Sequence, residues 1–186
     1  MGSNRGMEQH PIIGFNYRIS ELHAAIGAAQ TRKVPQILAA NKKNKTMLMN
    51  ALKGVPGVSF ARIPDASGDS STFLNLMLPD TETAKRIVEA FAGEGVGGFN
   101  YWYINMYHFI NQWGHLKDLK SAAPLPVHHY NKSQDYNALN LPKSQEVVGR
   151  LISFGIRCTW TEKEILALAA RMKTAIEKVV AVKTYA

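Results

Sequence analysis

Residues 14–27 read GFNYRISELHAAIG, and this stretch decides the fold prediction for the whole chain. Its second half predicts a helix from about Ser20 to Arg32. Ser20 is a suitable N-cap, Glu21 complements the positive helix end, and apolar residues recur at helical spacing. The glycine-to-serine segment before Ser20 therefore leads directly into a helix N-terminus, where backbone amides are available to an anion.

A second helix is expected to follow closely. Pro35 removes an amide donor, so we place it in the first turn of a helix that Gly54 ends. Leu48 and Leu52 belong to its apolar face. The basic residues of this helix are expected on its solvated outer face, which is the default for a charge run; they are Lys42, Lys43 and Lys45.

The remainder alternates between strand and helix patterns. The order strand, strand, helix, strand predicts a small α+β domain. A regular apolar stripe with Thr161 as N-cap predicts a long final helix. The expected elements before it are strands at 58–63, at 72–78 and from about Val96, helices at 81–91 and 144–152, and an irregular lobe at 105–140 with a short helix at about 109–119.

Composition sets broad limits on the class of protein. The 186 residues are 46% hydrophobic, which suits a packed globular core. The sequence has neither a membrane-length apolar run nor the apolar core of a secretory signal, so we expect a cytoplasmic protein. The single Cys158 excludes an internal disulfide and is expected to be a small buried residue. The net charge of +8 suits an anionic substrate, nucleic acid or a missing acidic partner surface alike.

The opening stretch resembles the signature of the DegT/DnrJ/StrS family of sugar aminotransferases, and the order of elements after it is also similar to that family. The resemblance implies an α+β fold, namely the C-terminal small domain of a fold-type-I aminotransferase. Such a domain is a small, mostly antiparallel sheet packed with helices and preceded by long interdomain helices. Residues 1–54 would be the end of the large domain with these helices, and residues 55–186 the small domain.

The resemblance also implies pyridoxal 5'-phosphate as cofactor and a homodimer as the assembly. The substrates that it implies are a keto sugar and an amino donor, with glutamate expected as the donor. Transamination requires a lysine amine that holds the cofactor and moves a proton. In the family this lysine lies upstream of the part that the chain resembles, and no matching lysine motif occurs here. We therefore expect a C-terminal portion that is inactive alone and does not bind the cofactor by itself.

Site residues follow from the same resemblance. Asn16 matches the family's asparagine that reaches the cofactor phosphate of the neighbouring subunit, although an ordinary turn residue is the alternative. Arg18 would pair with a substrate carboxylate or, alternatively, form a structural ion pair at the helix start. Tyr101, Tyr103 and His108 would line a sugar pocket, with alternate residues of this strand expected in the core instead.

Several stretches are most similar to the branch of the family that aminates the 8-position of a 3-deoxy-manno-octulosonate, a lipopolysaccharide sugar. They include the aromatic segment 101–103 and residues 159–162. The alternative from a different class is a standalone basic α+β module that binds an anionic ligand or nucleic acid without catalysis. Nucleic acid and membrane partners are not expected, and neither is a metal at His128 and His129, because adjacent side chains on an extended chain point apart.

Overall fold

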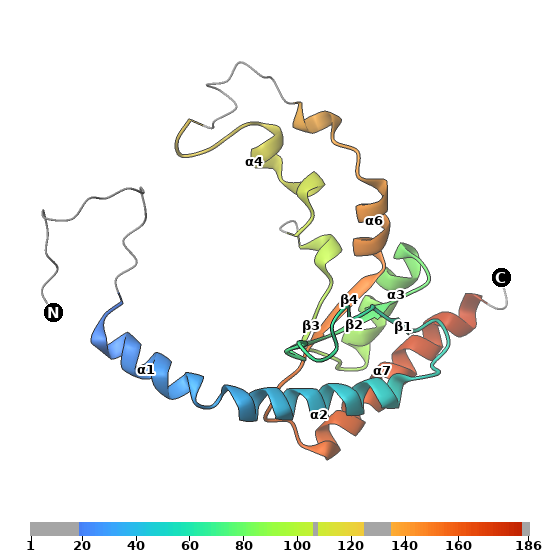
Figure 1. Cartoon of the computed structure of the whole chain (residues 1–186). Coiled ribbons are helices and arrows are strands. Elements are labelled where there is room, and N and C mark those ends of the chain that lie inside the picture. The colour runs from blue at the N-terminus through green and yellow to red at the C-terminus, as the bar shows by residue number, and fades with distance from the viewer. Residues whose placement is uncertain (1–18, 106–107, 125–134, 184–186) are drawn as a thin grey trace, which may run out of the picture. The chain divides into compact units, whose positions relative to one another are not determined.

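A computed structural model describes residues 19–105, 108–124 and 135–183 (Figure 1). The chain divides into two compact units, one ending at Gln36 and the other beginning at Ile37. Each unit is described by itself below. The domain boundary predicted after residue 54 remains a prediction, while the contacts of this chain assign most of the second helix to the unit that contains the sheet.

The first unit contains helix α1 (Glu21–Thr31). The predicted N-cap is confirmed, because the Ser20 hydroxyl accepts a hydrogen bond from the His23 amide at 3.3 Å. No residue of α1 is buried. Leu22 and Ile26, which form its apolar stripe, are 70% and 52% exposed. Within the first unit, the apolar stripe of α1 is therefore exposed.

Helix α2 (Val34–Leu52) has Pro35 in its first turn, as predicted. Leu48 and Leu52 are fully buried in the core of the second unit. The prediction for Lys45 was wrong. Its side chain is only 10% exposed and pairs with Asp69 at 2.5 Å, because it lies on the same face of the helix as Leu48 and Leu52 rather than on the outer face.

The second unit is built around an antiparallel sheet in the order β1-β2-β4-β3. Its strands are β1 (Ser59–Phe60), β2 (Phe73–Met77), β3 (Phe99–Asn100) and β4 (Leu151–Gly155). In the register, Leu74 lies opposite Phe154, and Phe99 lies opposite Phe154 on the other side. The α+β fold class with a small antiparallel sheet is therefore confirmed.

The central strand β4 corrects the prediction that residues 144–152 form one helix. Helix α6 (Pro142–Gly149) ends earlier, and Leu151 already begins the strand. A short apolar run fits a buried strand and a buried helix segment equally well, so periodicity alone cannot distinguish them. Pairing with both β2 and β3 decides the conformation of residues 151–155.

Helices α3 (Thr81–Gly93) and α7 (Glu162–Lys183) pack against each other in this unit. The Thr161 N-cap of α7 follows the prediction, since its hydroxyl accepts from the Glu164 amide at 3.3 Å. The N-cap of α3 is Asp80, whose carboxylate accepts from the Thr83 amide at 2.7 Å. The predicted stripe of α7 is buried; its members are Ile165, Leu168, Ala169, Met172, Ile176 and Val179.

Between β3 and α6 the described residues have little regular structure, as predicted for the irregular lobe. Its described elements are the short 3-10 helices η1 (Trp102–Ile104), η2 (Ile110–Gln112) and η3 (Tyr136–Ala138) and the single turn α4 (Gly114–Lys117). The loop after β4 carries Cys158, which is exposed. The expectation of a buried cysteine was wrong because Cys158 lies past the end of β4, outside the core.

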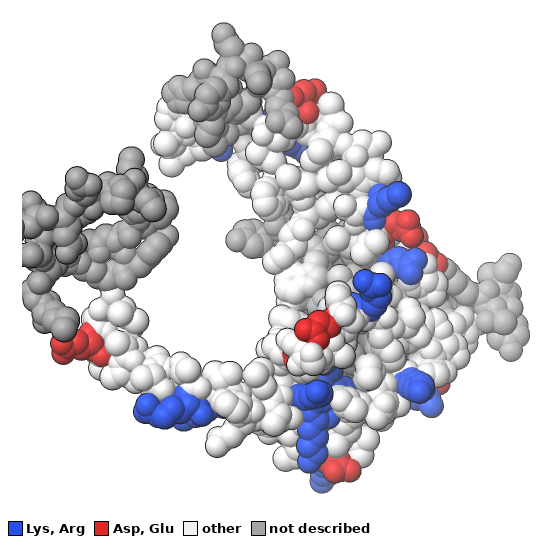
Figure 2. Space-filling model, in the orientation of Figure 1, with Lys and Arg blue, Asp and Glu red and all other residues white. Residues whose placement is uncertain are grey.

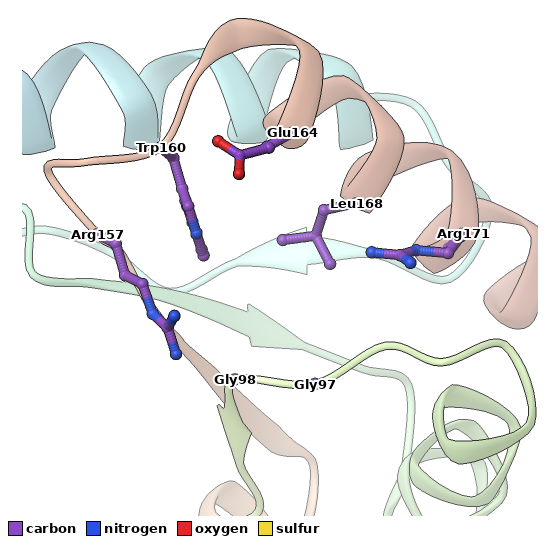
Figure 3. A pocket seen from close by; sticks show the side chains of 7 residues that line it. All are labelled: Gly97, Gly98, Arg157, Trp160, Glu164, Leu168 and Arg171. Carbon is purple, nitrogen blue, oxygen red and sulfur yellow. The ribbon is translucent and has the colours of Figure 1, made fainter.

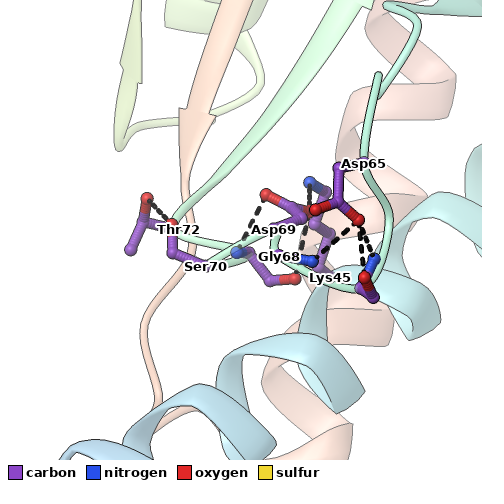
Figure 4. Close-up of polar contacts among 8 residues, drawn as sticks. Lys45, Asp65, Gly68, Asp69, Ser70 and Thr72 are labelled. Carbon is purple, nitrogen blue, oxygen red and sulfur yellow. Dashed lines mark hydrogen bonds and ion pairs between the residues drawn. The ribbon is translucent and has the colours of Figure 1, made fainter.

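The loop between β1 and β2 is joined to α2 by the ion pair between Lys45 and Asp69, and polar contacts within the loop shape it (Figure 4). Asp69 accepts from Lys45 and also from the Ser71 amide at 3.1 Å. Ser71 is 3% exposed and has a positive φ of 55°, a left-handed conformation that a local side-chain hydrogen bond helps to stabilise. In the same loop, Asp65 accepts from the amides of Ser67 and Gly68.

Candidate substrate and cofactor site

The residues predicted for the cofactor phosphate and the substrate carboxylate, Asn16 and Arg18, lie outside the described residues. What the structure does describe is the helix they lead into. α1 begins at Glu21, directly after an exposed Ser20 cap, so the first-turn amides of this helix lie at the surface. Such a helix start fits a phosphate group, because it supplies donors and the positive end of the helix dipole.

Trp102 is the centre of a cluster of side chains from three segments. Its indole Nε1 donates to the Ser153 hydroxyl on β4 at 2.8 Å. Its ring centroid is 4.2 Å from that of His108 and 6.4 Å from that of Phe73 on β2. The cluster therefore attaches the start of the irregular lobe to the sheet and places His108 beside it.

His108 is exposed, and its orientation is fixed by a neighbour. The Asn105 side chain accepts from the His108 amide at 3.2 Å through Oδ1, which leaves its Nδ2 to face the His108 Nδ1 at 2.7 Å. Because an amide nitrogen only donates, Nδ1 of the neutral ring accepts this hydrogen bond and the proton resides on Nε2. The ring proton of His108 is thus assigned to Nε2.

Tyr103 belongs to η1 and is half-buried. Its carbonyl oxygen accepts from the Gln112 side chain at 2.5 Å, and its hydroxyl accepts from the Gln145 side chain at 3.4 Å. The ring lies 6.3 Å from that of Phe109, nearly parallel to it. These contacts join η1, η2 and α6 around one aromatic residue whose hydroxyl hydrogen is still available to an acceptor.

Tyr101 occupies a different environment from Tyr103. It is 5% exposed, and its hydroxyl donates to the Gly149 carbonyl oxygen at 2.6 Å. Burial, reinforced by the neighbouring Tyr103 and Glu82, raises the pKa of Tyr101 to about 12. In the described fold Tyr101 is thus a packing residue, as expected for half of the aromatic segment, and its contact with substrate remains a prediction.

A pocket of about 340 Å³ opens at the other end of β3 (Figure 3). It is lined by Gly97, Gly98, Arg157, Trp160, Glu164, Leu168 and Arg171. The sequence did not indicate this site, because the residues come from three separate segments and none forms a spaced motif. The sequence shows only that residues 164, 168 and 171 are spaced so as to share one face of a helix. Any helix has residues at this spacing, so it does not indicate a site.

None of the described helices combines the length and the apolar character that a membrane span requires. Within the described ranges, no group of three or more histidine, cysteine, aspartate or glutamate side chains is arranged to hold a metal ion. His128 and His129 lie outside the described residues.

Comparison with known proteins gives the class of this chain. The profile of the DegT/DnrJ/EryC1/StrS aminotransferase family matches residues 1–173. Because this match covers most of the chain, the chain belongs to that family. The predicted resemblance to sugar aminotransferases is confirmed at this level.

Solved structures share the fold at low sequence identity. Helicobacter pylori PseC, an aminotransferase involved in the biosynthesis of pseudoaminic acid, is 14% identical with a TM-score of 0.64; the match covers 96% of this chain and 43% of PseC. 3-Amino-5-hydroxybenzoic acid synthase is 20% identical with a TM-score of 0.63, and the match covers 94% of this chain and 43% of the synthase. GDP-4-keto-6-deoxymannose-3-dehydratase, solved with a trapped PLP-glutamate geminal diamine, is 16% identical with a TM-score of 0.60. That match covers 88% of this chain and 38% of the dehydratase. The chain thus spans less than half the length of these proteins.

The same comparisons bear on the alternative class of protein. Nothing in the family match or the shared fold favours a standalone binding module for nucleic acid. On the face drawn in Figure 2, lysine and arginine are scattered, with aspartate and glutamate among them, rather than gathered into one basic patch. The net charge of +8 therefore has no visible concentration on this face that would suit a nucleic-acid backbone.

Proposed function

We propose that this chain is the C-terminal portion of a pyridoxal-phosphate-dependent aminotransferase that transfers an amino group from glutamate to a keto sugar. The acceptor we propose is the 8-position of a 3-deoxy-manno-octulosonate in lipopolysaccharide biosynthesis, and the enzyme is a cytoplasmic homodimer. The observation that carries the proposal is the family match over residues 1–173, with GFNYRISELHAAIG at its start. The glutamate trapped in the related dehydratase supports the choice of amino donor.

When bound, pyridoxal phosphate supplies the electron sink for moving an amino group, and the lysine that this requires belongs to the upstream part of the enzyme. The role proposed for this chain is to complete the site of the partner subunit. Asn16 would donate its side-chain amide to the cofactor phosphate, next to the α1 N-terminus. Arg18 would hold a substrate carboxylate through a charge-assisted hydrogen bond.

The irregular lobe would bind the sugar. His108 Nε2 is oriented as a donor by Asn105 and by the ring of Trp102, so it would bind a sugar hydroxyl or the keto oxygen. Tyr103 would present its hydroxyl and ring face to the same ligand. Tyr101 would keep these groups in place from the core through its hydrogen bond to Gly149.

The direct test compares the chain alone with the full product of its gene. The full product, reconstituted with pyridoxal phosphate and glutamate, is expected to aminate the 8-keto octulosonate with release of 2-oxoglutarate, whereas the chain alone is expected to be inactive. Amination by the chain alone would contradict the assignment of the lysine to the upstream part. A full product that accepts only nucleotide sugars would refute the octulosonate as acceptor.

Residue roles are tested in the full product. Asn16→Ala should weaken pyridoxal phosphate binding about tenfold, the equivalent of one lost hydrogen bond to a charged group; unchanged cofactor affinity would exclude this role. His108→Gln should raise the KM for the keto sugar and leave the KM for glutamate unchanged. The matched control is His115→Gln, an exposed histidine of the same lobe whose ring stacks on Trp113 instead.

A further inference from the structure

The pocket between the β3 N-terminus, the loop after β4 and α7 has two positively charged walls. Arg157 comes from the loop and Arg171 from α7, and Figure 3 shows both side chains directed into the pocket from opposite sides, above Gly97 and Gly98. Both arginines are exposed. Among the residues that the structure describes, neither guanidinium has an ion pair or hydrogen bond. Two unneutralised guanidinium groups that face one volume attract an anion.

Among the described residues, the single acidic residue of the pocket forms no ion pair with either arginine. Glu164 accepts from the Thr161 amide at 2.7 Å and from the Thr161 hydroxyl at 2.8 Å. These hydrogen bonds lower the pKa of Glu164 and hold its carboxylate at the helix cap, away from both guanidinium groups in Figure 3. The formal charge of the pocket is therefore +1, from two arginines and one glutamate. A monoanion balances this charge, whereas a phosphate dianion exceeds it.

The remaining lining shows what kind of molecule carries the anionic group. Leu168 is 7% exposed and forms an apolar part of the wall, and Trp160 is half-buried against the core and adds an aromatic side chain. Gly97 and Gly98 have no side chain, and a Cβ atom added at either position would meet nothing within 4 Å. A ligand can therefore approach the backbone closely at this edge, with its non-polar face against the indole.

We propose that this pocket binds a small monocarboxylate, such as a sugar acid, whose carboxylate lies between Arg157 and Arg171 and whose body contacts Trp160. The pocket differs from the lobe assigned to the keto sugar in its lining residues, which come from the segment before β3, the loop after β4 and α7 and include neither Tyr103 nor His108. The proposal does not depend on aminotransferase activity, since it requires only the described fold of the second unit.

The test uses this chain, labelled with ¹⁵N, and three probes: D-glucuronate, D-glucose and inorganic phosphate. Glucuronate should shift the amide signals of Gly97 and Gly98 and the indole signal of Trp160, with millimolar affinity. Glucose should not shift them, and phosphate should bind more weakly than glucuronate. Glucose binding equal to glucuronate would overturn the role of charge, and tighter phosphate binding would overturn the carboxylate.

Variants test the two arginines separately. Arg157→Gln and Arg171→Gln should each weaken glucuronate binding about tenfold, as expected for loss of a charge-assisted hydrogen bond. Arg62→Gln, a change at another exposed arginine of the same unit, should leave binding unchanged. Equal affinity in all three variants would overturn the proposal, and so would glucuronate shifts confined to residues outside the pocket. The latter measurement needs only the wild-type chain, so it holds even if a variant fails to fold.

Discussion

Tyr101 donates its hydroxyl hydrogen to the carbonyl oxygen of Gly149 across 48 residues of sequence, at a distance of 2.6 Å. The bond ties the end of β3 to the end of α6, immediately before the central strand. It therefore holds closed the long irregular connection that carries His108. Both ends of the candidate sugar lobe depend on this contact between a buried phenol and a backbone carbonyl.

The hydrogen bond predicts a loss of stability in Tyr101→Phe. Removing the hydroxyl leaves a carbonyl oxygen without its partner, and we expect the free energy of unfolding to fall by about 1–2 kcal/mol. Urea denaturation followed by circular dichroism measures this change. Tyr136→Phe is the matched control, because Tyr136 belongs to the same lobe but is only half-buried, and it should have a smaller effect.

The pKa of Tyr101 predicts a specific dependence on alkaline pH. Burial raises this pKa from 10.0 to about 12, so the folded state holds the phenolic proton more tightly than the unfolded state does. The resulting stability is fully present below pH 10 and is lost as the pH rises through about 12. The wild type should lose stability over this window more steeply than Tyr101→Phe. Parallel curves for the two proteins would show that Tyr101 does not titrate in this way.

Gly149 also meets α3 at a distance that excludes a side chain. A Cβ atom at this position would lie 2.3 Å from the Thr81 hydroxyl oxygen and 3.2 Å from its methyl carbon. We therefore expect Gly149→Ala to destabilise the chain by about 1–3 kcal/mol. Gly93→Ala is the control, since a Cβ there meets nothing within 4 Å.

A double-mutant cycle separates this clash from other effects of the substitution. Thr81→Ala removes the two atoms closest to the new Cβ, so it should restore part of the stability that Gly149→Ala loses. Additive losses in the double variant would mean that the close approach to Thr81 is not the cause.

The pair Lys45–Asp69 predicts an acid-dependent contribution to stability. The hydrogen bond from Lys45 lowers the pKa of Asp69 below its ordinary 3.8, against the opposing effect of burial. The stabilisation is therefore present above pH 3.8 and is lost as the pH falls through the lowered folded value. Asp69→Asn should cost about 1–3 kcal/mol at pH 7, and this difference from wild type should shrink below pH 4.

The matched control for that pair lies on the surface of α3. Lys85 and Glu82 form an exposed ion pair at 2.8 Å, so Glu82→Gln should leave the midpoint of urea unfolding nearly unchanged at pH 7. If Asp69→Asn proves as mild as Glu82→Gln, the loop between β1 and β2 does not depend on Lys45.

The sequence predicted those features that rest on local patterns. Ser20 and Thr161 cap helices as expected, because capping depends on a few neighbouring residues. The sequence-based prediction failed where long-range contacts determine the structure. Leu151–Gly155 forms strand β4 because it pairs with β2 and β3. Lys45 points inward because it pairs with an aspartate 24 residues away.

The candidate site divides in the same way. His108 was predicted from a linear aromatic motif, yet its orientation depends on Trp102, whose indole is held by Ser153 of a strand that the sequence did not reveal. Arg157 and Arg171 come together only through the packing of α7 beside the loop after β4. Residue spacing in a single sequence does not indicate which distant segments pack together, so only the structure reveals this pocket.

The exposed stripe of α1 predicts self-association of this chain. Leu22 and Ile26 are 70% and 52% exposed on a helix with no buried residue, and uncovered apolar faces of this kind favour contact with another protein surface. A second copy is the partner always present, and an isologous contact would satisfy both stripes at once. Light scattering should give a mass above the monomer value of 20.6 kDa that rises with concentration.

Substitutions on two helices locate the contact. Leu22→Gln with Ile26→Gln should shift the measured mass to that of the monomer, because it replaces the apolar stripe with side chains that water solvates. Leu166→Gln, at a position on α7 that is 49% exposed, should leave the association intact. Wild-type chain that stays monomeric at every concentration would show that α1 does not mediate contact between copies, and loss of association in Leu166→Gln alone would move the interface to α7.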